Sequence, residues 1–211
     1  MHSSSVETAV GKAISPCNTL AQITPYDLDL VRSGDDAFET AFAFSAGEYR
    51  KHFGAQLTRG FSGYLCIHRA GRLQAVCGFQ SAETPLFLDQ YLSAPAWATA
   101  QSRFATPIPA SQLVELGGFA VRKRALALPF MAALAPALLD MGFSHAVATA
   151  TIPVRRCLSQ VGVTTQDLGA ADPVSLHDKA ADWGTYYSMR PRVVAGSISQ
   201  AVASLAVQLT C

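Results

Sequence analysis

The chain has 211 residues, half of them hydrophobic and 15% charged, with a formal net charge of +1. This composition supports a substantial core and argues against wholesale disorder. The nearly balanced charge argues against a generally basic nucleic-acid-binding protein, so we expect no nucleic-acid partner. A chain of this length is typical of one domain with extensions.

The cysteines and the apolar segments bear on the cellular compartment. The five cysteines, Cys17, Cys66, Cys77, Cys157 and Cys211, form no CxxC pair and have no metal-ligand spacing. Their odd number fits a reduced interior better than a disulfide framework, and we expect no metal site. The N-terminal residues lack the regions of a signal peptide, and no long apolar run is flanked like a membrane span. We therefore expect a cytoplasmic location and no stable insertion into a membrane.

The first part of the chain differs in composition from the rest. Residues 1–34 are polar and rich in turn-forming residues, and we expect them to form a loosely attached N-terminal arm. Residues 35–211 are expected to form the folded domain. At its start, Asp35 or Asp36 is placed to cap a helix that runs through Phe44.

A hairpin is the clearest local pattern in the next part of the chain. Residues 48–53 predict a second short helical piece, and residues 63–80 then contain two apolar strands, GYLCIHR and LQAVCGF. The dipeptide Ala70-Gly71 between these strands predicts a tight turn. Residues 84–92, TPLFLDQYL, predict a short helix or an extended segment that leads into proline-rich loops.

The second half of the chain alternates strand and helix patterns. The predicted elements are a strand over residues 113–121, a helix over 127–141 closed by Gly142, a strand over 145–152, a helix over 153–161 ended by Gly162, and a strand-like piece with a terminal helix within 183–205. Together with the hairpin, this order predicts an α+β fold, a mixed α/β sandwich with one strand–helix–strand crossover.

The strand LVELGGFAV, residues 113–121, contains a carboxylate and two adjacent glycines in an apolar run. Alternation along a strand predicts that Glu115, Gly117 and Phe119 share one face of the sheet. Adjacent glycines weaken a strand, so they are expected where a bulge or a closely approaching ligand needs the space. Gly117 and Gly118 therefore indicate a bulge or a ligand contact at this point of the strand. If the strand parts from its neighbour there, its backbone N–H groups become available to a ligand carbonyl.

Three cations follow this strand directly and precede a predicted helix. Arg122, Lys123 and Arg124 lie beside the free backbone amides that a helix N-terminus provides. Such a combination favours the binding of an anion, and a pyrophosphate is the obvious candidate.

This layout resembles the acyl-CoA-binding core of the GNAT-type acyltransferases. In that family the fourth strand splays from the fifth, and a loop with the pattern Q/R-x-x-G-x-G/A wraps the CoA pyrophosphate. The matching stretch here is RKRALA, which has Ala125 where the pattern has a glycine. The positions that the resemblance assigns to donor binding are Phe119, Val121, Arg122, Arg124, Ala125 and Ala127.

A resemblance to the thermostable haemolysin family covers more of the chain, from about Glu48 to Ile198. It is carried by PLFLDQYL, VELGGFAV, ATATIPVRRCLSQVGV and DWGTYYSMRPRVVAGSI, in this order and with similar spacing. That family is similar in fold to GNAT enzymes and to acyl-homoserine-lactone synthases. The resemblance implies a GNAT-like fold with a central, mostly antiparallel, splayed sheet flanked by helices. The family name records a haemolytic phenotype and identifies no molecular activity.

Candidate catalytic residues follow from the pattern and from the resemblance. Glu115 is a candidate general base that deprotonates an amine, and its alternative role is a structural carboxylate paired with an arginine such as Arg50. The resemblance to GNAT enzymes implies that a tyrosine protonates the departing thiolate, and Tyr186 and Tyr187 are the candidates. We take Tyr187 as the catalytic member of this pair.

Candidate substrate-binding residues lie in three places. Asp89 and Tyr91 are expected to line the acceptor pocket, with a surface cap and a core tyrosine as their alternative roles. Arg190 and Arg192 flank a proline and are placed to hold a carboxylate or a phosphate. Arg50 is the further cation that we assign to substrate binding.

The leading functional hypothesis is an N-acyltransferase that moves an acyl group from an acyl thioester to an amine of a small molecule. The donor would be acyl-CoA or the acyl-phosphopantetheine of an acyl-carrier protein, and no metal is expected. Two alternatives remain open at this point. The first alternative is a membrane-active haemolysin or cytolysin. The second is a non-catalytic CoA-binding protein of the same fold.

Overall fold

The computed structural model describes residues 28–58 and 60–209 of the chain. The strands are β1 (Asp29–Arg32), β2 (Gly63–Arg69), β3 (Arg72–Ser81), β4 (Leu113–Val121), β5 (His145–Ala150), β6 (Gln166–Ala170) and β7 (Arg192–Ser197). The α-helices are α2 (Phe38–Phe53), α3 (Ala96–Gln101), α4 (Ala127–Asp140), α5 (Ile152–Gln160) and α6 (Ile198–Leu209). Five 3-10 helices are η1 (Phe87–Tyr91), η2 (Ala110–Gln112), η3 (Arg124–Leu126), η4 (Pro173–Trp183) and η5 (Tyr186–Met189).

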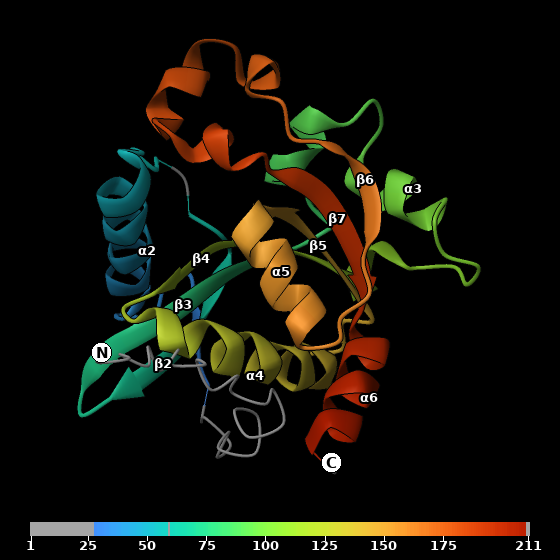
Figure 1. Ribbon diagram of the computed structural model, residues 1–211, viewed down its shortest axis with the longest axis horizontal. Helices are drawn as coiled ribbons and strands as arrows, with labels where there is room; N and C mark the ends of the chain where they lie inside the picture. The colour runs from blue at the N-terminus through green and yellow to red at the C-terminus, as the bar shows by residue number, and fades with distance from the viewer. Residues whose placement is uncertain (1–27, 59, 210–211) are drawn as a thin grey trace, which may run out of the picture.

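All seven described strands form one sheet in the order β1-β2-β3-β4-β5-β7-β6. β4 and β5 are parallel, and every other neighbouring pair is antiparallel. The chain passes from β4 to β5 through α4, a strand–helix–strand crossover as predicted from the sequence (Figure 1). A second crossover, which was not predicted, passes through α5 and connects β5 to β6, since both of these strands are antiparallel to β7. The mostly antiparallel α+β arrangement is therefore confirmed.

Helices cover both faces of this sheet because neighbouring residues of a strand point to opposite sides. Leu65 and Cys77 pack in a core cluster with α4 and α6, whereas Tyr64 and Val76 of the same strands pack with α2. A third cluster around Leu113 packs η1 and α3 against the sheet. Among the described residues, no helix has both the length and the apolar composition needed to cross a bilayer.

Parallel pairing between β4 and β5 is short. It runs from Leu113 opposite His145 to Leu116 opposite Ala148 and then stops, although β4 continues along β3 as far as Val121. The two strands therefore part in the middle of the sheet, as the glycines of β4 and the GNAT resemblance predicted.

Local patterns predicted the hairpin correctly and the first helix incorrectly. Ala70 and Gly71 have φ values of 50° and 71°, which form the left-handed turn expected between β2 and β3. The two short helices expected before the hairpin are one continuous helix, α2. Its middle residues Ser45 and Ala46 are buried against the sheet, so tertiary packing carries the helix through the predicted gap.

Two edge strands were not predicted. β1 lies within the segment expected to be an arm, where its residues 29–32 pair with β2. β6 pairs with β7 at the other edge of the sheet. The rest of the expected arm, residues 1–27, lies outside the described residues, as do Cys17 and Cys211.

The segment η4–η5 is fastened to the C-terminal end of α2. The Gln56 N–H donates to the Asp182 carbonyl at 2.6 Å, and the Thr185 N–H donates to the Phe53 carbonyl at 2.8 Å. Gly184, between these contacts, has φ 52° and ψ −122°, a conformation that side-chain-bearing residues rarely adopt. A Cβ atom at this position would lie 2.1 Å from the Phe53 carbonyl oxygen. The close approach therefore requires a glycine.

We predict that Gly184→Ala lowers the free energy of unfolding by at least ~3 kcal/mol, because backbone strain adds to a collision with Phe53. The matched control is Gly71→Ala, which also has a positive φ but has open space around the added Cβ. That change should cost only about 1 kcal/mol. Urea unfolding of both variants measures the difference, and equal losses would contradict the close packing at Gly184.

Candidate active site

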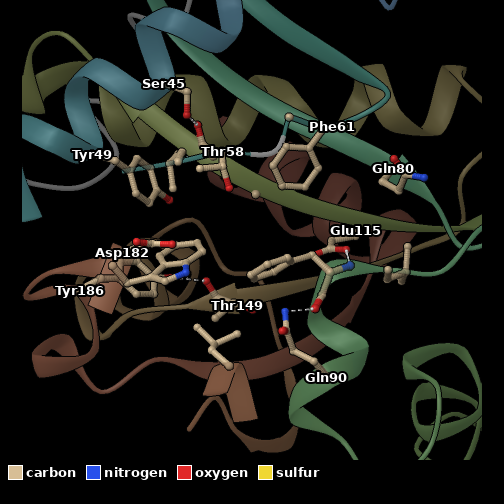
Figure 2. A pocket seen from close by; sticks show the side chains of 18 of the residues that line it. Ser45, Tyr49, Thr58, Phe61, Gln80, Gln90, Glu115, Thr149, Asp182 and Tyr186 are labelled. Atoms are coloured by element: carbon tan, nitrogen blue, oxygen red, sulfur yellow. Dashed lines mark hydrogen bonds between the residues drawn. The ribbon is translucent and has the colours of Figure 1, made fainter. Parts of the chain in front are cut away.

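A cavity of about 440 Å³ lies between α2 and the sheet, bounded on one side by the segment η4–η5. Tyr64 from the cluster under α2 and Leu86 from the cluster around η1 both line it, so it occupies the space between two parts of the core. Residues from β4 and β5 form its floor where these strands part, and Figure 2 shows Glu115 and Thr149 there. The cavity therefore opens onto the gap in the sheet.

A bulge in β4 shapes this floor. Val76 pairs with Ala120 and Gly78 pairs with Gly117, so residues 118 and 119 together face the single residue between them on β3. The bulge changes the alternation of side chains along β4. Phe119 consequently stacks on Phe130 of α4, with ring centroids 5.3 Å apart. The prediction that Phe119 shares a face with Glu115 is wrong for this reason.

Ser45 of α2 holds the bulge from the side of the cavity. Its buried hydroxyl donates a hydrogen bond to the Gly118 carbonyl oxygen at 2.8 Å. Gly118 has φ 55°, and a Cβ atom there would lie 2.9 Å from the Ser45 Oγ. Glycine is therefore needed both for the backbone conformation and for the approach of the serine.

Phe61 fills the space above the glycines of two neighbouring strands. A Cβ atom at Gly78 would lie 2.2 Å from its ring, and one at Gly117 would lie 2.3 Å from it. The ring lines the cavity and lies near Tyr64, with centroids 6.4 Å apart. Phe61 thus limits how far the cavity extends along the sheet.

Glu115 is buried, with 3% of its surface exposed, and its carboxylate lies at the cavity. Its Oε2 accepts a hydrogen bond from the Phe87 N–H at 2.7 Å. β4 supplies the residue, and the N-terminal end of η1 supplies the donor that orients it. The alternative of an ion pair with Arg50 is not seen, because Arg50 is exposed on α2 and does not line the cavity.

Asp89 and Tyr91 both line the cavity, as expected for an acceptor pocket. The Asp89 carboxylate accepts the N–H of Leu86 at 2.8 Å and the N–H of Ala96 at 2.7 Å, so it also fixes the loop around η1. The Tyr91 hydroxyl lies 2.6 Å from the Tyr187 hydroxyl. Tyr187 itself does not line this cavity and instead lines a shallower depression behind it.

The two hydroxyls of this pair are strongly shielded from solvent. Burial raises the pKa of Tyr91 well above its usual value, and its hydrogen bond to Tyr187 raises it further. Burial also raises the pKa of Tyr187 to about 12, although the bond from Tyr91 acts in the opposite direction. These directions fit Tyr91 as the donor of the bond. Both side chains are therefore neutral phenols at physiological pH.

An aromatic wall, made of Tyr49, Phe87, Trp183 and Tyr186, lies beside Tyr91 and Tyr187. Trp183 lies 5.5 Å from Phe87 and 5.1 Å from Tyr186 between ring centroids, and Tyr186 stacks on Tyr49 at 5.9 Å. The Tyr186 hydroxyl donates to the Thr149 carbonyl at 3.2 Å. Tyr186 was expected as an alternative to Tyr187 as the catalytic acid. The structure instead places it in this aromatic wall.

Thr149 follows Ala148, the last residue of β5 that pairs with β4, and so lies at the point where these two strands part. Its Oγ1 atom is buried and has no hydrogen-bond partner among the described residues. Figure 2 shows the side chain at the cavity, between Glu115 and Tyr186. A buried hydroxyl without a partner costs free energy, so it marks a place where a polar atom of a ligand belongs.

The two arginines of the cationic turn after β4 lie in different surroundings. The Arg122 Nε donates to the Leu73 carbonyl at 3.2 Å, and its guanidinium lies 5.1 Å from the ring centroid of Phe44. Arg122 therefore ties the hairpin and α2 to the turn. Arg124 and Ala125 are exposed in η3, directly before α4 begins at Ala127. Val121, like Phe119, packs towards the α4 side of the sheet.

The remaining arginines expected to bind substrate are not brought to the cavity. Arg190 and Arg192 line the depression behind Tyr187 instead. Arg192 forms an ion pair with Asp167, and the Arg190 carbonyl accepts a hydrogen bond from Arg155 at 3.1 Å. Within the described residues, no group of three His, Cys, Asp or Glu side chains is arranged to hold a metal ion.

Comparisons with known proteins agree with this geometry. The family model described as "Thermostable hemolysin" matches residues 31–202. No curated protein matches the chain significantly. The CoA-dependent acyl-homoserine lactone synthase BjaI, solved with SAM and isopentyl-CoA, is 14% identical with a TM-score of 0.58, over 87% of this chain and 89% of its own.

Two further solved structures share the fold. The acyl-homoserine lactone synthase LasI is 14% identical with a TM-score of 0.58, over 84% of this chain and 93% of its own. FeeM, an N-acyl amino acid synthase from uncultured soil microbes, is 10% identical with a TM-score of 0.52, over 83% of this chain and 98% of its own. At such low identities, the structural similarity shows a shared fold and nothing beyond it.

The tyrosines of the site predict how stability depends on alkaline pH. All five described tyrosines have raised pKa values, with Tyr64 and Tyr187 at about 12. A raised pKa in the folded state gives stability that is full below the unfolded pKa near 10 and is lost as pH rises through the folded pKa. The free energy of unfolding should therefore fall between about pH 10 and pH 12.

Absorbance of tyrosinate near 295 nm measures this directly. Up to about pH 11, the five described tyrosines, out of six in the chain, should stay largely neutral in the folded protein. Ionisation of two or more tyrosines in that range, while the protein is still folded, would contradict the buried phenol pair and the aromatic wall.

Proposed function

The chain belongs to the thermostable hemolysin family, and from its fold and cavity we propose that it is an N-acyltransferase of the GNAT type. It moves an acyl group from an acyl thioester, either acyl-CoA or an acyl-carrier protein, to the amine of a small molecule. The observation that carries this proposal is the parting of β4 and β5 after Leu116 and Ala148, with the Glu115 carboxylate at the opening. A thioester arm placed in that gap would present its carbonyl to the cavity.

The shared fold supports an acyl thioester as donor. BjaI was solved with isopentyl-CoA, and FeeM is an N-acyl amino acid synthase, so proteins of this fold join acyl groups to amines. In this chain, the exposed Arg124 and the backbone amides of residues 125–127 lie at the start of α4. The N–H groups of Leu126 and Ala127 already donate to the Lys123 and Arg124 carbonyls. We therefore assign Arg124 and the N-terminal end of α4 to the phosphate groups of the donor, because a cation and the positive end of a helix dipole together stabilise an anion. Arg122 positions the turn through its bonds to the hairpin.

Charge changes in the reaction fit the polar groups of the cavity. As the amine nitrogen bonds to the carbonyl carbon, its N–H proton passes to the Glu115 carboxylate. The Thr149 hydroxyl donates to the carbonyl oxygen, where negative charge develops. When the carbon–sulfur bond breaks, the thiolate takes the proton back from Glu115, since a carboxylic acid is a stronger acid than a thiol. The products are an amide and a free thiol.

Tyr187 has a different part in this scheme from the one expected. It lies behind Tyr91 and outside the cavity, and its raised pKa makes it a poor proton donor. We therefore assign Tyr187 to holding Tyr91, which lines the cavity, through the hydrogen bond between their hydroxyls. Asp89 fixes the loop that carries Tyr91 through its two backbone hydrogen bonds.

We predict that Glu115→Gln lowers kcat/KM for acyl transfer by ~100-fold or more, because glutamine cannot accept the proton. The measurement follows release of free thiol from acyl-CoA and acyl-carrier donors in the presence of a panel of amines. Glu39→Gln is the matched control, since Glu39 is exposed in the first turn of α2 and does not line the cavity. It should retain wild-type activity.

Other outcomes separate the two rival functions. Binding of CoA without thiol release by the wild-type protein would indicate a non-catalytic binding protein. Equal leakage of lipid vesicles caused by the wild type and by Glu115→Gln, again without thiol release, would indicate a directly membrane-active protein. Either result would overturn the transferase proposal.

We also predict that Arg124→Glu weakens CoA binding by about tenfold or more, since it replaces a cation at the phosphate site with an anion. Arg103→Glu is the control, because Arg103 is exposed directly after α3, which packs in a different core cluster from α4. Isothermal titration calorimetry with CoA measures both. Equal affinities for the two variants would place the donor phosphates elsewhere.

A further inference from the structure

The charged groups that line the cavity are mainly acidic. Among the described residues, Asp89, Glu115 and Asp182 contribute carboxylates, and Lys179 is the one basic residue. Lys179 is exposed and forms no ion pair with any described carboxylate. Of these carboxylates, the one on Asp182 carries the preference for a cationic group, and the partial enclosure of the cavity strengthens the attraction.

Two of these carboxylates lie apart. Figure 2 shows Glu115 beside β4 and Asp182 across the cavity, next to Tyr186. Asp182 ends η4 close to α2, where its backbone carbonyl accepts the Gln56 N–H at 2.6 Å. Its half-buried carboxylate has no hydrogen-bond or ion-pair partner among the described side chains. It is thus available to a ligand at a distance from the reacting end of the cavity.

The aromatic wall lies on the same side as Asp182. Trp183 and Tyr186 are 5.1 Å apart between centroids, and Tyr49 stacks on Tyr186. Faces of tryptophan and tyrosine attract ammonium groups, and the attraction grows when water is excluded. Burial keeps Tyr49 and Tyr186 neutral by raising their pKa values, so the wall retains its phenol rings across the physiological range.

An independent observation favours a polar ligand in this cavity. The buried Thr149 hydroxyl lines it and has no partner among the described residues. The hydroxyl lies nearer the gap in the sheet than the aromatic wall does, because Thr149 follows the last β4–β5 pair. The cavity therefore combines a reacting end, which holds Glu115 and Thr149, with a cation-binding end, which holds Asp182 and Trp183.

We propose that the acceptor is an amine with a second positive charge, such as a linear diamine or a longer polyamine. One amino group lies at Glu115, and the second cationic group lies between the Asp182 carboxylate and the faces of Trp183 and Tyr186. This inference rests on the proposed transferase function for the role of the first amine. The binding of the dication can be measured without any acyl transfer.

The experiment compares three linear amines of the same length. Cadaverine carries two charges in neutral solution, whereas 5-amino-1-pentanol and pentylamine carry one. The chain has two tryptophans, so Trp97→Phe leaves Trp183 as the single reporter of binding by fluorescence. Because the Trp97 indole donates to the Ile108 carbonyl at 2.6 Å, calorimetry on the wild-type protein repeats the measurement without that substitution.

We expect cadaverine to bind about tenfold tighter than 5-amino-1-pentanol, and this ratio to fall as salt is raised. Asp182→Asn should bring the ratio close to one. The control is Asp178→Asn, which makes the same change of charge at an exposed site in η4 outside the cavity lining, and it should preserve the ratio. Melting temperatures of both variants check that they are folded.

The possible outcomes separate the inference from the function on which it rests. Equal or tighter binding of the monocations, or a ratio that Asp182→Asn leaves unchanged, would overturn the dication proposal even if acyl transfer is observed. Selective cadaverine binding without thiol release from any donor would support the cation site and overturn the transferase. Tight binding together with acylation of cadaverine would support both.

Discussion

The site depends on one interruption of backbone pairing in the middle of the sheet. After Leu116 and Ala148, β4 stays with β3 and β5 stays with β7, so the backbone edges that face each other no longer form a ladder. Neighbouring parallel strands normally form a continuous ladder of hydrogen bonds, so a structural feature must keep β4 and β5 apart here. The bulge at Gly118 turns β4 away, and Ser45 fixes that bulge from α2. The cavity and the buried glutamate lie at this interruption, and so does the threonine hydroxyl that has no hydrogen-bond partner in the part of the chain that the structure describes.

The far wall of the cavity comes from a segment with little regular structure. η4 and η5 cross from β6 to β7, and they stand against α2 through the contact at Gly184 and the hydrogen bonds to Phe53 and Gln56. Three aromatic residues on this segment, Trp183, Tyr186 and Tyr187, then meet residues of α2, η1 and β5. Under the proposed function, the segment η4–η5 supplies binding surface, and strands β4 and β5 supply the reacting groups.

Local signals in the sequence determined what could be predicted. The hairpin, β4 and α4 have strong periodicity and clear turn residues, and they were predicted within a few positions. β1 and β6 are short edge strands whose pairing depends on distant partners. Glu115 was singled out because a carboxylate in an apolar strand is unusual, and the structure places it at the cavity. Ser45, Phe61, Thr149 and Asp182 gave no such signal, since their roles arise only when α2, β5 and η4 come together. Phe119 was assigned to the wrong face because one extra residue in a strand shifts every later side chain.

The two glycines of ELGGFAV are present for separate reasons. Gly118 adopts a positive φ and receives the serine of α2, whereas Gly117 has no such conformation and instead leaves room for the Phe61 ring, which also covers Gly78. The side chain at position 61 therefore occupies the space that side chains at positions 78 and 117 would otherwise fill. Related sequences should vary there in concert: an alanine or larger residue at 78 or 117 is tolerated where position 61 has become small, and the hollow beside the sheet then changes its outline without any change in the backbone.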